Sequence, residues 1–250
     1  DEEFPMSVNR RADQEVVELI PGVSARILAN RSTGSEMLTI MEATMDPGVA
    51  IPYHWHANAD ETMFVIEGSA EMLIDGHRFT AGPNDTVLAP RGRSHAVRNI
   101  RDIPLTFLGI FPVPEREIEP MDLPAEIVDE RISSATFRAE SEPVEFRPGV
   151  LRYEMAGDFI GAESTYLSEL VFSPEGWTQT HYHPAHEEGI YCLSGEISAA
   201  FGQDEILLKA GDIFVPPPGV RHGNRNRSSA DARVLAIHPV LNPPPRVDVD

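Results

Sequence analysis

Two sets of three histidines and one glutamate give this 250-residue chain its clearest capacity for chemistry. The sets are His54, His56, Glu61 and His95, and His181, His183, Glu188 and His222. Imidazole and carboxylate ligands suit divalent first-row metals, and we expect Fe²⁺ first, with Mn²⁺, Ni²⁺ or Zn²⁺ as alternatives. Four protein ligands leave open positions on a six-coordinate ion, which favours catalysis over a closed structural site. The sequence therefore predicts two metal ions per chain.

A single His-x-His pair would be weak evidence, because such pairs are commonly surface groups. The set here occurs twice, and each member of the second set follows its counterpart by 127 positions. The same offset relates Pro21-Gly22-Val23 to Pro148-Gly149-Val150 and Pro112-Val113 to Pro239-Val240. A repeat maintained without a gap over this span indicates two copies of one domain.

The spacing of the predicted ligands constrains the elements that carry them. His54 and His56 stand at i and i+2, so on a strand they point to one face. Glu61 is an odd step beyond His56, so the small and polar residues between them must bend the chain. His95 comes from a later strand, which means that separate strands must converge on one ion.

The hydrophobic pattern is that of short strands. In the first copy we expect strands at 36–45, 61–66, 70–74, 86–89, 96–99 and 105–111, with a hairpin turn at Asp75-Gly76. The second copy repeats this order. Many short antiparallel strands separated by Gly and Pro predict an all-β sandwich or closed barrel.

Three segments follow from the repeat. Residues 1–113 are predicted to form the N-terminal barrel and residues 148–250 the C-terminal barrel. Residues 114–147 are rich in Pro and Glu and are predicted to form a linker with a short helix at 124–132. The run Asn242-Pro243-Pro244-Pro245 cannot continue a strand and is predicted to be a tail.

Composition excludes several classes of partner. The formal net charge of −20 disfavours nucleic acid and anionic membrane surfaces, so we expect a small-molecule substrate. A single cysteine, Cys192, allows no disulfide within the chain and fits a reducing cytoplasm. No apolar run reaches the length of a membrane span. A homodimer is a further expectation, since barrel edges must be covered.

The motifs around the histidines resemble those of the cupin superfamily. Gly48, His54, His56, Glu61 and Gly68 match the first cupin motif, G-x5-H-x-H-x3,4-E-x6-G. Gly211, Pro217, Gly219, His222 and Asn226 match the second, G-x5-P-x-G-x2-H-x3-N. The resemblance implies a bicupin with two jelly-roll barrels (double-stranded β-helices), each binding a metal through its three histidines and one glutamate. Asn84 and Glu175 replace motif glycines without touching a ligand.

Other residues receive weaker interpretations. Met63 and Val65 stand two and four positions after Glu61, and Ile190 and Cys192 stand two and four positions after Glu188. On a strand these side chains point to the same face as the glutamate, so all four are predicted to line the substrate pockets. His186 and Glu187 either contact substrate or are solvated loop groups. Arg98 and Arg225 either clamp a substrate carboxylate or form outward salt bridges. His238 is interpreted as structural.

The leading functional hypothesis is a metal-dependent dioxygenase acting on a small aromatic or enolic compound, similar to the quercetin dioxygenase type of bicupin. Glu61 or Glu188 would be catalytic, accepting the hydroxyl proton. The alternatives are a non-redox isomerase, lyase, decarboxylase or cyclase, in which the ion is a Lewis acid, and a non-enzymatic binding protein. No dinucleotide fingerprint, P-loop or nucleophile elbow is present, so neither a nucleotide cofactor nor nucleophilic serine chemistry is expected.

Overall fold

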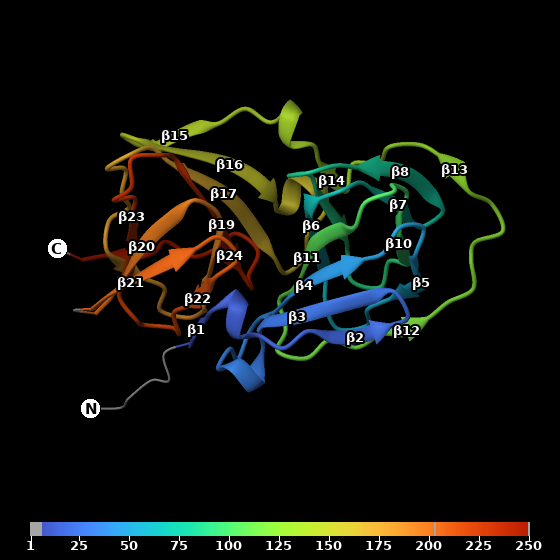
Figure 1. The fold of residues 1–250 in the computed structure, drawn as a ribbon, viewed down its shortest axis with the longest axis horizontal. Coiled ribbons are helices and arrows are strands. Elements are labelled where there is room, and N and C mark those ends of the chain that lie inside the picture. Colours follow the sequence, from blue (N-terminus) through green and yellow to red (C-terminus); the bar gives the residue numbers. More distant parts are fainter. Residues whose placement is uncertain (1–6, 203, 250) are drawn as a thin grey trace.

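The computed structural model describes residues 7–202 and 204–249, and their regular secondary structure is almost entirely β-strand. Two halves lie side by side along the long axis, the N-terminal half on the right and the C-terminal half on the left of Figure 1. Each half is a barrel made of an inner sheet, which faces the other half, and an outer sheet. This confirms the predicted pair of jelly-roll barrels. In the described part of the chain, no helix is long and apolar enough to cross a membrane.

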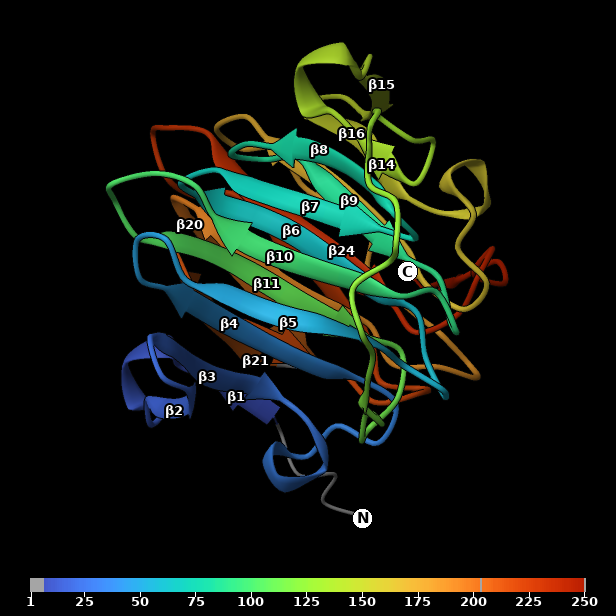
Figure 2. The same ribbon diagram turned by 90° about the vertical axis from the view of Figure 1, so that its right-hand side faces the viewer.

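The N-terminal barrel has a seven-stranded inner sheet and a six-stranded outer sheet. The inner sheet runs, in spatial order, β14 (Ala135–Thr136), β9 (Thr86–Ala89), β6 (Glu61–Glu67), β11 (Leu105–Phe111), β4 (Thr39–Met45), β3 (Val23–Ala29) and β2 (Val17–Ile20). The outer sheet, which faces the viewer in Figure 2, runs β12 (Glu119–Pro120), β5 (Ala50–Trp55), β10 (His95–Asn99), β7 (Ala70–Ile74), β8 (His77–Ala81) and β13 (Val128–Asp129).

The C-terminal barrel repeats this plan. Its inner sheet runs β1 (Ser7–Asn9), β22 (Ile213–Val215), β19 (Gly189–Ser194), β24 (Ala232–His238), β17 (Tyr166–Phe172), β16 (Val150–Ala156) and β15 (Val144–Arg147). Its outer sheet runs β21 (Asp204–Lys209), β20 (Glu196–Phe201), β23 (His222–Arg225), β18 (His181–Tyr182) and β25 (Val247–Asp248). Short 3-10 turns occur at η1 (Arg11–Asp13), η2 (Arg31–Thr33), η3 (Arg138–Glu140) and η4 (Asp158–Ile160).

The predicted strands and the hairpin turn are present. Asp75 and Gly76 both have positive φ, as the predicted tight hairpin between β7 and β8 requires. Asn84 and Glu175, which replace motif glycines, also have positive φ, at 72° and 65°. The backbone of both turns is therefore kept without glycine, at a conformational cost that is lower for asparagine than for glutamate.

Apolar side chains of the two inner sheets form one core between the barrels. Leu108 and Ile110 of β11 belong to the same buried cluster as Leu235 and Ile237 of β24. Two further clusters fill the interiors of the N-terminal and C-terminal barrels. Burial of apolar surface therefore joins the halves as well as filling each of them.

Each copy of the repeat contributes its first strand to the other barrel. Residues 7–9 were expected in the N-terminal barrel, but β1 pairs with β22 of the C-terminal barrel, with Val8 opposite Phe214. In the same way β14, at the end of the linker, pairs with β9 of the N-terminal barrel, with Ala135 opposite Val87. The offset of 127 holds for these pairs too, so the repeat extends further upstream than the sequence motifs indicated.

After each exchanged strand, an arginine binds a buried glutamate of its own copy and so holds the chain to the barrel that it left. Arg11 binds Glu42 through two hydrogen bonds of 2.7 Å, and Arg26 binds the same carboxylate at 3.0 Å. The counterparts in the second copy are Arg138 and Glu169, whose Nε and Oε2 atoms lie 2.6 Å apart. Both glutamates are almost fully buried, so each needs its arginine partners.

A second pair of buried carboxylates precedes the predicted glutamate ligands. Asp60 accepts hydrogen bonds of 2.8 Å from the backbone N–H groups of Glu163 and Ser164 in the other half. Glu187 accepts hydrogen bonds of 2.8 and 3.0 Å from the N–H groups of Glu36 and Met37. The residue before each glutamate ligand is thus attached to the opposite barrel.

The linker is extended, and the short helix expected at 124–132 is not formed. Val128 N–H donates to Gly76 O at 2.8 Å and Glu130 N–H to Arg78 O at 3.1 Å, so this segment pairs with the edge of β8. These sheet hydrogen bonds replace a short helix that would have had no buried face. The C-terminal tail also returns to the protein, since β25 pairs with β18.

The ion pair of the exchanged segment can be tested by Arg11→Met. This change leaves the buried Glu42 carboxylate with only Arg26, and we expect a loss of about 2 kcal/mol in unfolding free energy. The measurement is urea-induced unfolding. Arg98→Met, at an exposed position of β10, is the control and should change stability by less than about 0.5 kcal/mol. Equal effects of the two changes would contradict this role for Arg11.

Candidate metal centres

The first four predicted ligands converge inside the N-terminal barrel. His54 and His95 lie on β5 and β10 of the outer sheet, and Glu61 begins β6 of the inner sheet. His56 follows the end of β5, and the chain then bends across to β6, as the odd spacing predicted. Glu61 Oε2 lies 2.9 Å from His56 Nε2, 2.7 Å from His95 Nε2 and 4.0 Å from His54 Nε2.

Backbone carbonyl groups orient all three imidazoles. The Nδ1 atom of His54 lies 2.8 Å from Pro52 O, that of His95 3.1 Å from Arg93 O, and that of His56 2.6 Å from Glu117 O. A carbonyl oxygen only accepts, so each Nδ1 carries a proton and donates. In a neutral ring the Nε2 lone pair then points to the centre of the cluster, which is the arrangement of a histidine ligand.

The pKa values of Glu61 and His54 favour an ionised carboxylate beside a neutral imidazole. Burial alone would raise the pKa of Glu61, but hydrogen bonds from His56 and His95 outweigh it and hold that pKa well below its usual range. Burial, aided by the nearby His95, lowers the pKa of His54 to about 4. Glu61 is therefore ionised near neutral pH, and His54 is neutral and free to act as a ligand.

The second four residues repeat this geometry in the C-terminal barrel. Glu188 Oε2 lies 2.9 Å from His183 Nε2, 2.8 Å from His222 Nε2 and 3.6 Å from His181 Nε2. The Nδ1 atoms of His181 and His222 each lie 2.8 Å from a backbone carbonyl oxygen. His183 differs, because its buried Nδ1 has no hydrogen-bond partner among the described residues.

These donor sets fit a divalent cation. With Nδ1 of His95 donating to a carbonyl, Nε2 can donate to Glu61 only if the ring is protonated and charged. A metal ion at the centre removes this conflict, because it binds the Nε2 lone pairs and the carboxylate oxygen together. All eight side chains are held in two groups whose ligand atoms lie within 4.8 Å of one another.

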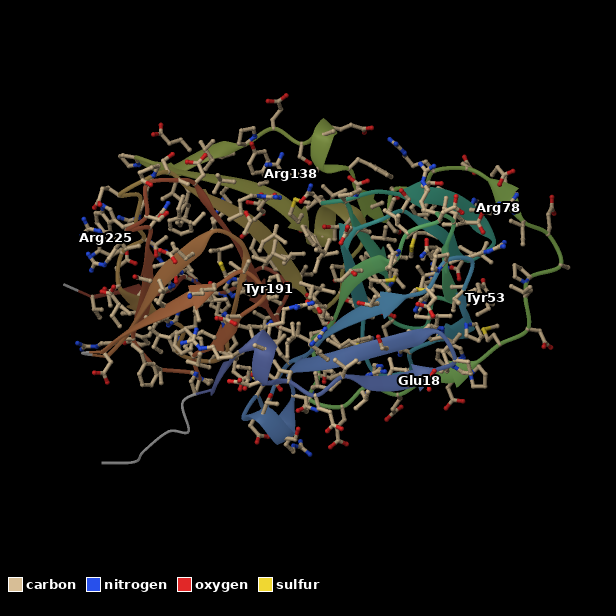
Figure 3. All side chains as sticks on the ribbon, in the orientation of Figure 1. Glu18, Tyr53, Arg78, Arg138, Tyr191 and Arg225 are labelled. Carbon is tan, nitrogen blue, oxygen red and sulfur yellow. The ribbon has the colours of Figure 1, made fainter. Side chains whose placement is uncertain are left out.

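A cavity of about 370 Å³ adjoins the first cluster and is lined mainly by apolar side chains. They include Ile51, Met41, Val97, Phe107 and Phe111, from both sheets of the barrel. Figure 3 labels Tyr53, another lining residue, within the N-terminal half. The linker supplies Arg116, Ile118 and Pro120 to the rim. The pocket is suited to an organic molecule with a hydrophobic body.

The cavity beside the second cluster, of about 330 Å³, has a more polar lining. At four positions related by the 127-residue offset, an apolar residue of the first pocket is replaced by a polar one of the second. The replacements are Met41 by Ser168, Ile51 by Thr178, Val97 by Asn224 and Phe111 by His238. Pro243, Pro244 and Pro245 of the tail complete the wall.

Two further histidines stand beside the second cluster. His238 Nε2 lies 3.9 Å from Glu188 Oε1, and His238 Nδ1 lies 3.2 Å from His186 Nε2. Burial lowers the pKa of each of these two rings to about 4, so both are neutral near pH 7. Although the sequence favoured a structural role for His238, its ring lines the pocket and lies near the carboxylate.

Several predicted pocket residues are placed differently. Met63 lines the first cavity, whereas Val65 packs in the core of that barrel and Ile190 and Cys192 in the core of the other. Strand alternation brings all four side chains into a barrel interior, as predicted. The cavity, however, occupies only the end of the barrel beside the metal ligands. Burial raises the pKa of Cys192 to about 12, so it is an unreactive thiol.

The proposed carboxylate clamp is not found at Arg98 and Arg225. Both side chains are exposed, and Arg225 pairs with Glu175 at the outer end of the C-terminal half (Figure 3). Glu187 is an anchor between barrels rather than a pocket residue. Sequence reasoning missed Arg116 of the linker, whose only available signal was its position three residues after the repeat ends.

A model of the cupin domain matches residues 41–111 and 168–238, which together cover more than half of the chain. The chain belongs to the cupin family. Each match contains all four predicted ligands of one barrel, so this is a bicupin, and the resemblance seen in its motifs is confirmed.

Known bicupins are similar to it over both barrels. It is 26% identical over 266 aligned residues to quercetin 2,3-dioxygenase of Bacillus subtilis (strain 168), which covers 88% of this chain and 79% of that protein. A stretch of 73 residues is 40% identical to oxalate decarboxylase OxdC of the same organism, covering 27% of this chain and 19% of the other. The solved structure of oxalate decarboxylase from Bacillus subtilis at pH 4.6 gives a TM-score of 0.77 at 19% identity, covering 97% and 78% of the two chains, a likeness of fold.

Two clusters of similar geometry predict two metal ions per chain, because each offers the same four donors. His54→Ala and His181→Ala should each remove about one ion, measured by elemental analysis after loading with a single divalent metal. His77→Ala, at a partly exposed histidine paired with Glu130, is the control. Wild-type protein that cannot be loaded above trace levels would refute both sites.

Proposed function

We propose that this bicupin is a metal-dependent dioxygenase that acts on a small aromatic or enolic organic compound in its first barrel. The observation that carries the proposal is the cavity of about 370 Å³ beside the first cluster, with its mainly apolar lining. A pocket of this kind binds the hydrophobic body of an organic substrate and places it against the predicted ligands. The likeness to quercetin 2,3-dioxygenase along most of the chain supports the same class of reaction.

The residues of the first barrel have separate tasks in this proposal. A bound divalent metal supplies Lewis-acid and redox chemistry at the centre of the cluster. Met41, Val97 and Phe111 hold the organic body of the substrate and exclude water from it. Glu61, whose pKa is held low by its histidine neighbours, is an ionised carboxylate that can accept the hydroxyl proton of the substrate.

Oxygen uptake tests this reaction. Fe²⁺-loaded protein should consume dioxygen when supplied with a hydroxylated aromatic or enolic substrate, and His54→Ala should lower the rate at least about 100-fold, since the first metal is lost. His77→Ala serves as the folded control. If uptake by Fe²⁺-, Mn²⁺- and Ni²⁺-loaded protein stays at the background level over a panel of flavonols, catechols and enols, the dioxygenase proposal is wrong.

The second pocket favours another candidate, a non-redox lyase, decarboxylase, isomerase or cyclase reaction in the C-terminal barrel. His238 lies near Glu188, and Tyr166, Ser168 and Asn224 add polar groups, which suit a small polar substrate and proton transfer. The similarity to oxalate decarboxylase agrees with such chemistry but covers a short stretch.

This second candidate predicts turnover without oxygen. Protein loaded with Zn²⁺ or Mn²⁺ under strict anaerobiosis should convert a small carboxylic or hydroxy acid, and His238→Phe should slow that reaction at least about 10-fold while keeping the metal content. His238→Phe installs the residue that the first barrel has at the same position. An unchanged rate in that variant would remove His238 from the reaction.

A further inference from the structure

The first pocket contains one cation, Arg116, which lacks an anionic partner within the described residues. Most arginines of this acidic chain form ion pairs. Those of the described residues that form none are Arg98, Arg101, Arg116 and Arg221. All except Arg116 are exposed, whereas Arg116 is half-buried in the wall of the cavity. A cation kept away from water without a carboxylate partner costs stability, so its retention in a pocket calls for a ligand.

The backbone around Arg116 is fixed to the residues of the metal centre. Asn58 Nδ2 donates to Glu115 O at 2.9 Å, and Asn58 Oδ1 accepts from Glu117 N–H at 3.0 Å. Glu117 O in turn accepts the hydrogen bond of 2.6 Å from His56 Nδ1. The residues on both sides of Arg116 are therefore held by the loop that contains the ligands, which fixes the backbone of Arg116 relative to the predicted metal centre.

The surroundings of the guanidinium also point to an occupant with both an apolar and a charged part. The Cζ atom of Arg116 lies 5.1 Å from the ring centroid of Phe111, and Ile118 and Pro120 continue the apolar rim. Burial lowers the pKa of Arg116, and the carboxylate of Glu61 opposes this shift, so the two charges influence one another across the pocket. Arginine remains protonated in proteins, and the pocket therefore presents a permanent positive charge.

The second pocket has no equivalent. The residue 127 positions after Arg116 is Pro243, and the counterpart of Asn58 is Ala185. The arginines that line that pocket, Arg152 and Arg246, are neutralised by Glu154 at 2.9 Å and Asp248 at 2.8 Å. Among the described residues, an unpaired cation in a pocket wall is thus a feature of the first barrel alone.

We propose that Arg116 binds a carboxylate of the substrate in the first pocket, so that the substrate is an aromatic or enolic compound bearing a carboxylate besides the oxygen that faces the metal. This inference deepens the proposed function and rests on it for the reaction, but not for the binding. The planar guanidinium can bind both carboxylate oxygens, and the apolar walls strengthen the interaction by excluding water.

The test compares a charged probe with its neutral analogue. Zn²⁺-loaded protein carrying His181→Ala, which removes the second metal, is titrated calorimetrically with 3-hydroxy-2-naphthoate and with its methyl ester. We expect the acid to bind at least about 10-fold more tightly than the ester, the value of one charge-assisted hydrogen bond. Arg116→Met should abolish this preference and leave ester binding unchanged, while Arg116→Lys should retain part of it.

Two further variants separate this role from a general effect on the fold. Asn58→Ala, which releases the chain beside Arg116, should reduce the preference for the acid while leaving metal content intact. Arg98→Met removes an exposed, unpaired arginine from the same barrel and should leave the preference unchanged. A series of such acids is titrated into the wild-type protein and into the Arg116→Met variant. If no acid binds the wild-type protein more tightly than the variant, the assignment of Arg116 is wrong.

Failure of this inference is distinguishable from failure of the proposed reaction. A charge preference that depends on Arg116, in a protein that consumes no oxygen, upholds the binding role and refutes the dioxygenase. Oxygen uptake with neutral substrates, in a protein whose affinities do not respond to Arg116→Met, refutes the binding role and upholds the dioxygenase.

Discussion

A carboxylate buried among three imidazoles is the interaction on which the rest of each barrel depends. Burial raises the free energy of an ionised glutamate, and only a cationic or hydrogen-bonding environment can offset that cost. In both barrels the histidines supply this environment, and backbone carbonyls that bind Nδ1 of nearly all of them decide which nitrogen faces inward. A cation bound at the centre of each cluster would compensate the negative charge of the buried glutamate.

Each cluster requires strands from the two sheets of its barrel to keep fixed positions relative to one another. Contacts between the two copies hold these strands in place. Each predicted glutamate ligand stands at the entry to a strand, directly after a carboxylate that is bound by the other barrel. Each barrel also receives one strand from the other copy, and the arginine that follows this strand binds a buried glutamate of the donating copy. Displacing one barrel would therefore disturb the entry to β6 or β19 in its neighbour. The two predicted metal centres are held by one folded unit rather than by two independent domains joined by a linker.

The parts of this structure that were predictable from sequence are those governed by local rules. Period-2 patterns located the strands, and the spacing from His56 to Glu61 required a bend that the structure contains. The exchanged strand β1 was missed because its three residues contain no periodic pattern of their own, although the Arg11-Ala12-Asp13 and Arg138-Ala139-Glu140 sequences obey the same offset. The extended linker was missed because its conformation is set by the edge of β8, a partner about 50 residues away in sequence.

The predicted metal ligands and the pocket walls are formed by different parts of this chain. Only the ligands are the same in the two copies. The ligands lie near strand ends, where the register of the barrel fixes them, and they are identical in both halves. The pocket walls combine barrel positions such as Val97 and Asn224 with segments outside the repeat, the linker in one half and the proline-rich tail in the other. A duplicated gene can change the second group without disturbing the buried carboxylate, since the wall residues that differ between the two pockets form no hydrogen bonds to it. Two centres with the same types of ligand can in this way lie beside an apolar pocket in one barrel and a polar pocket in the other.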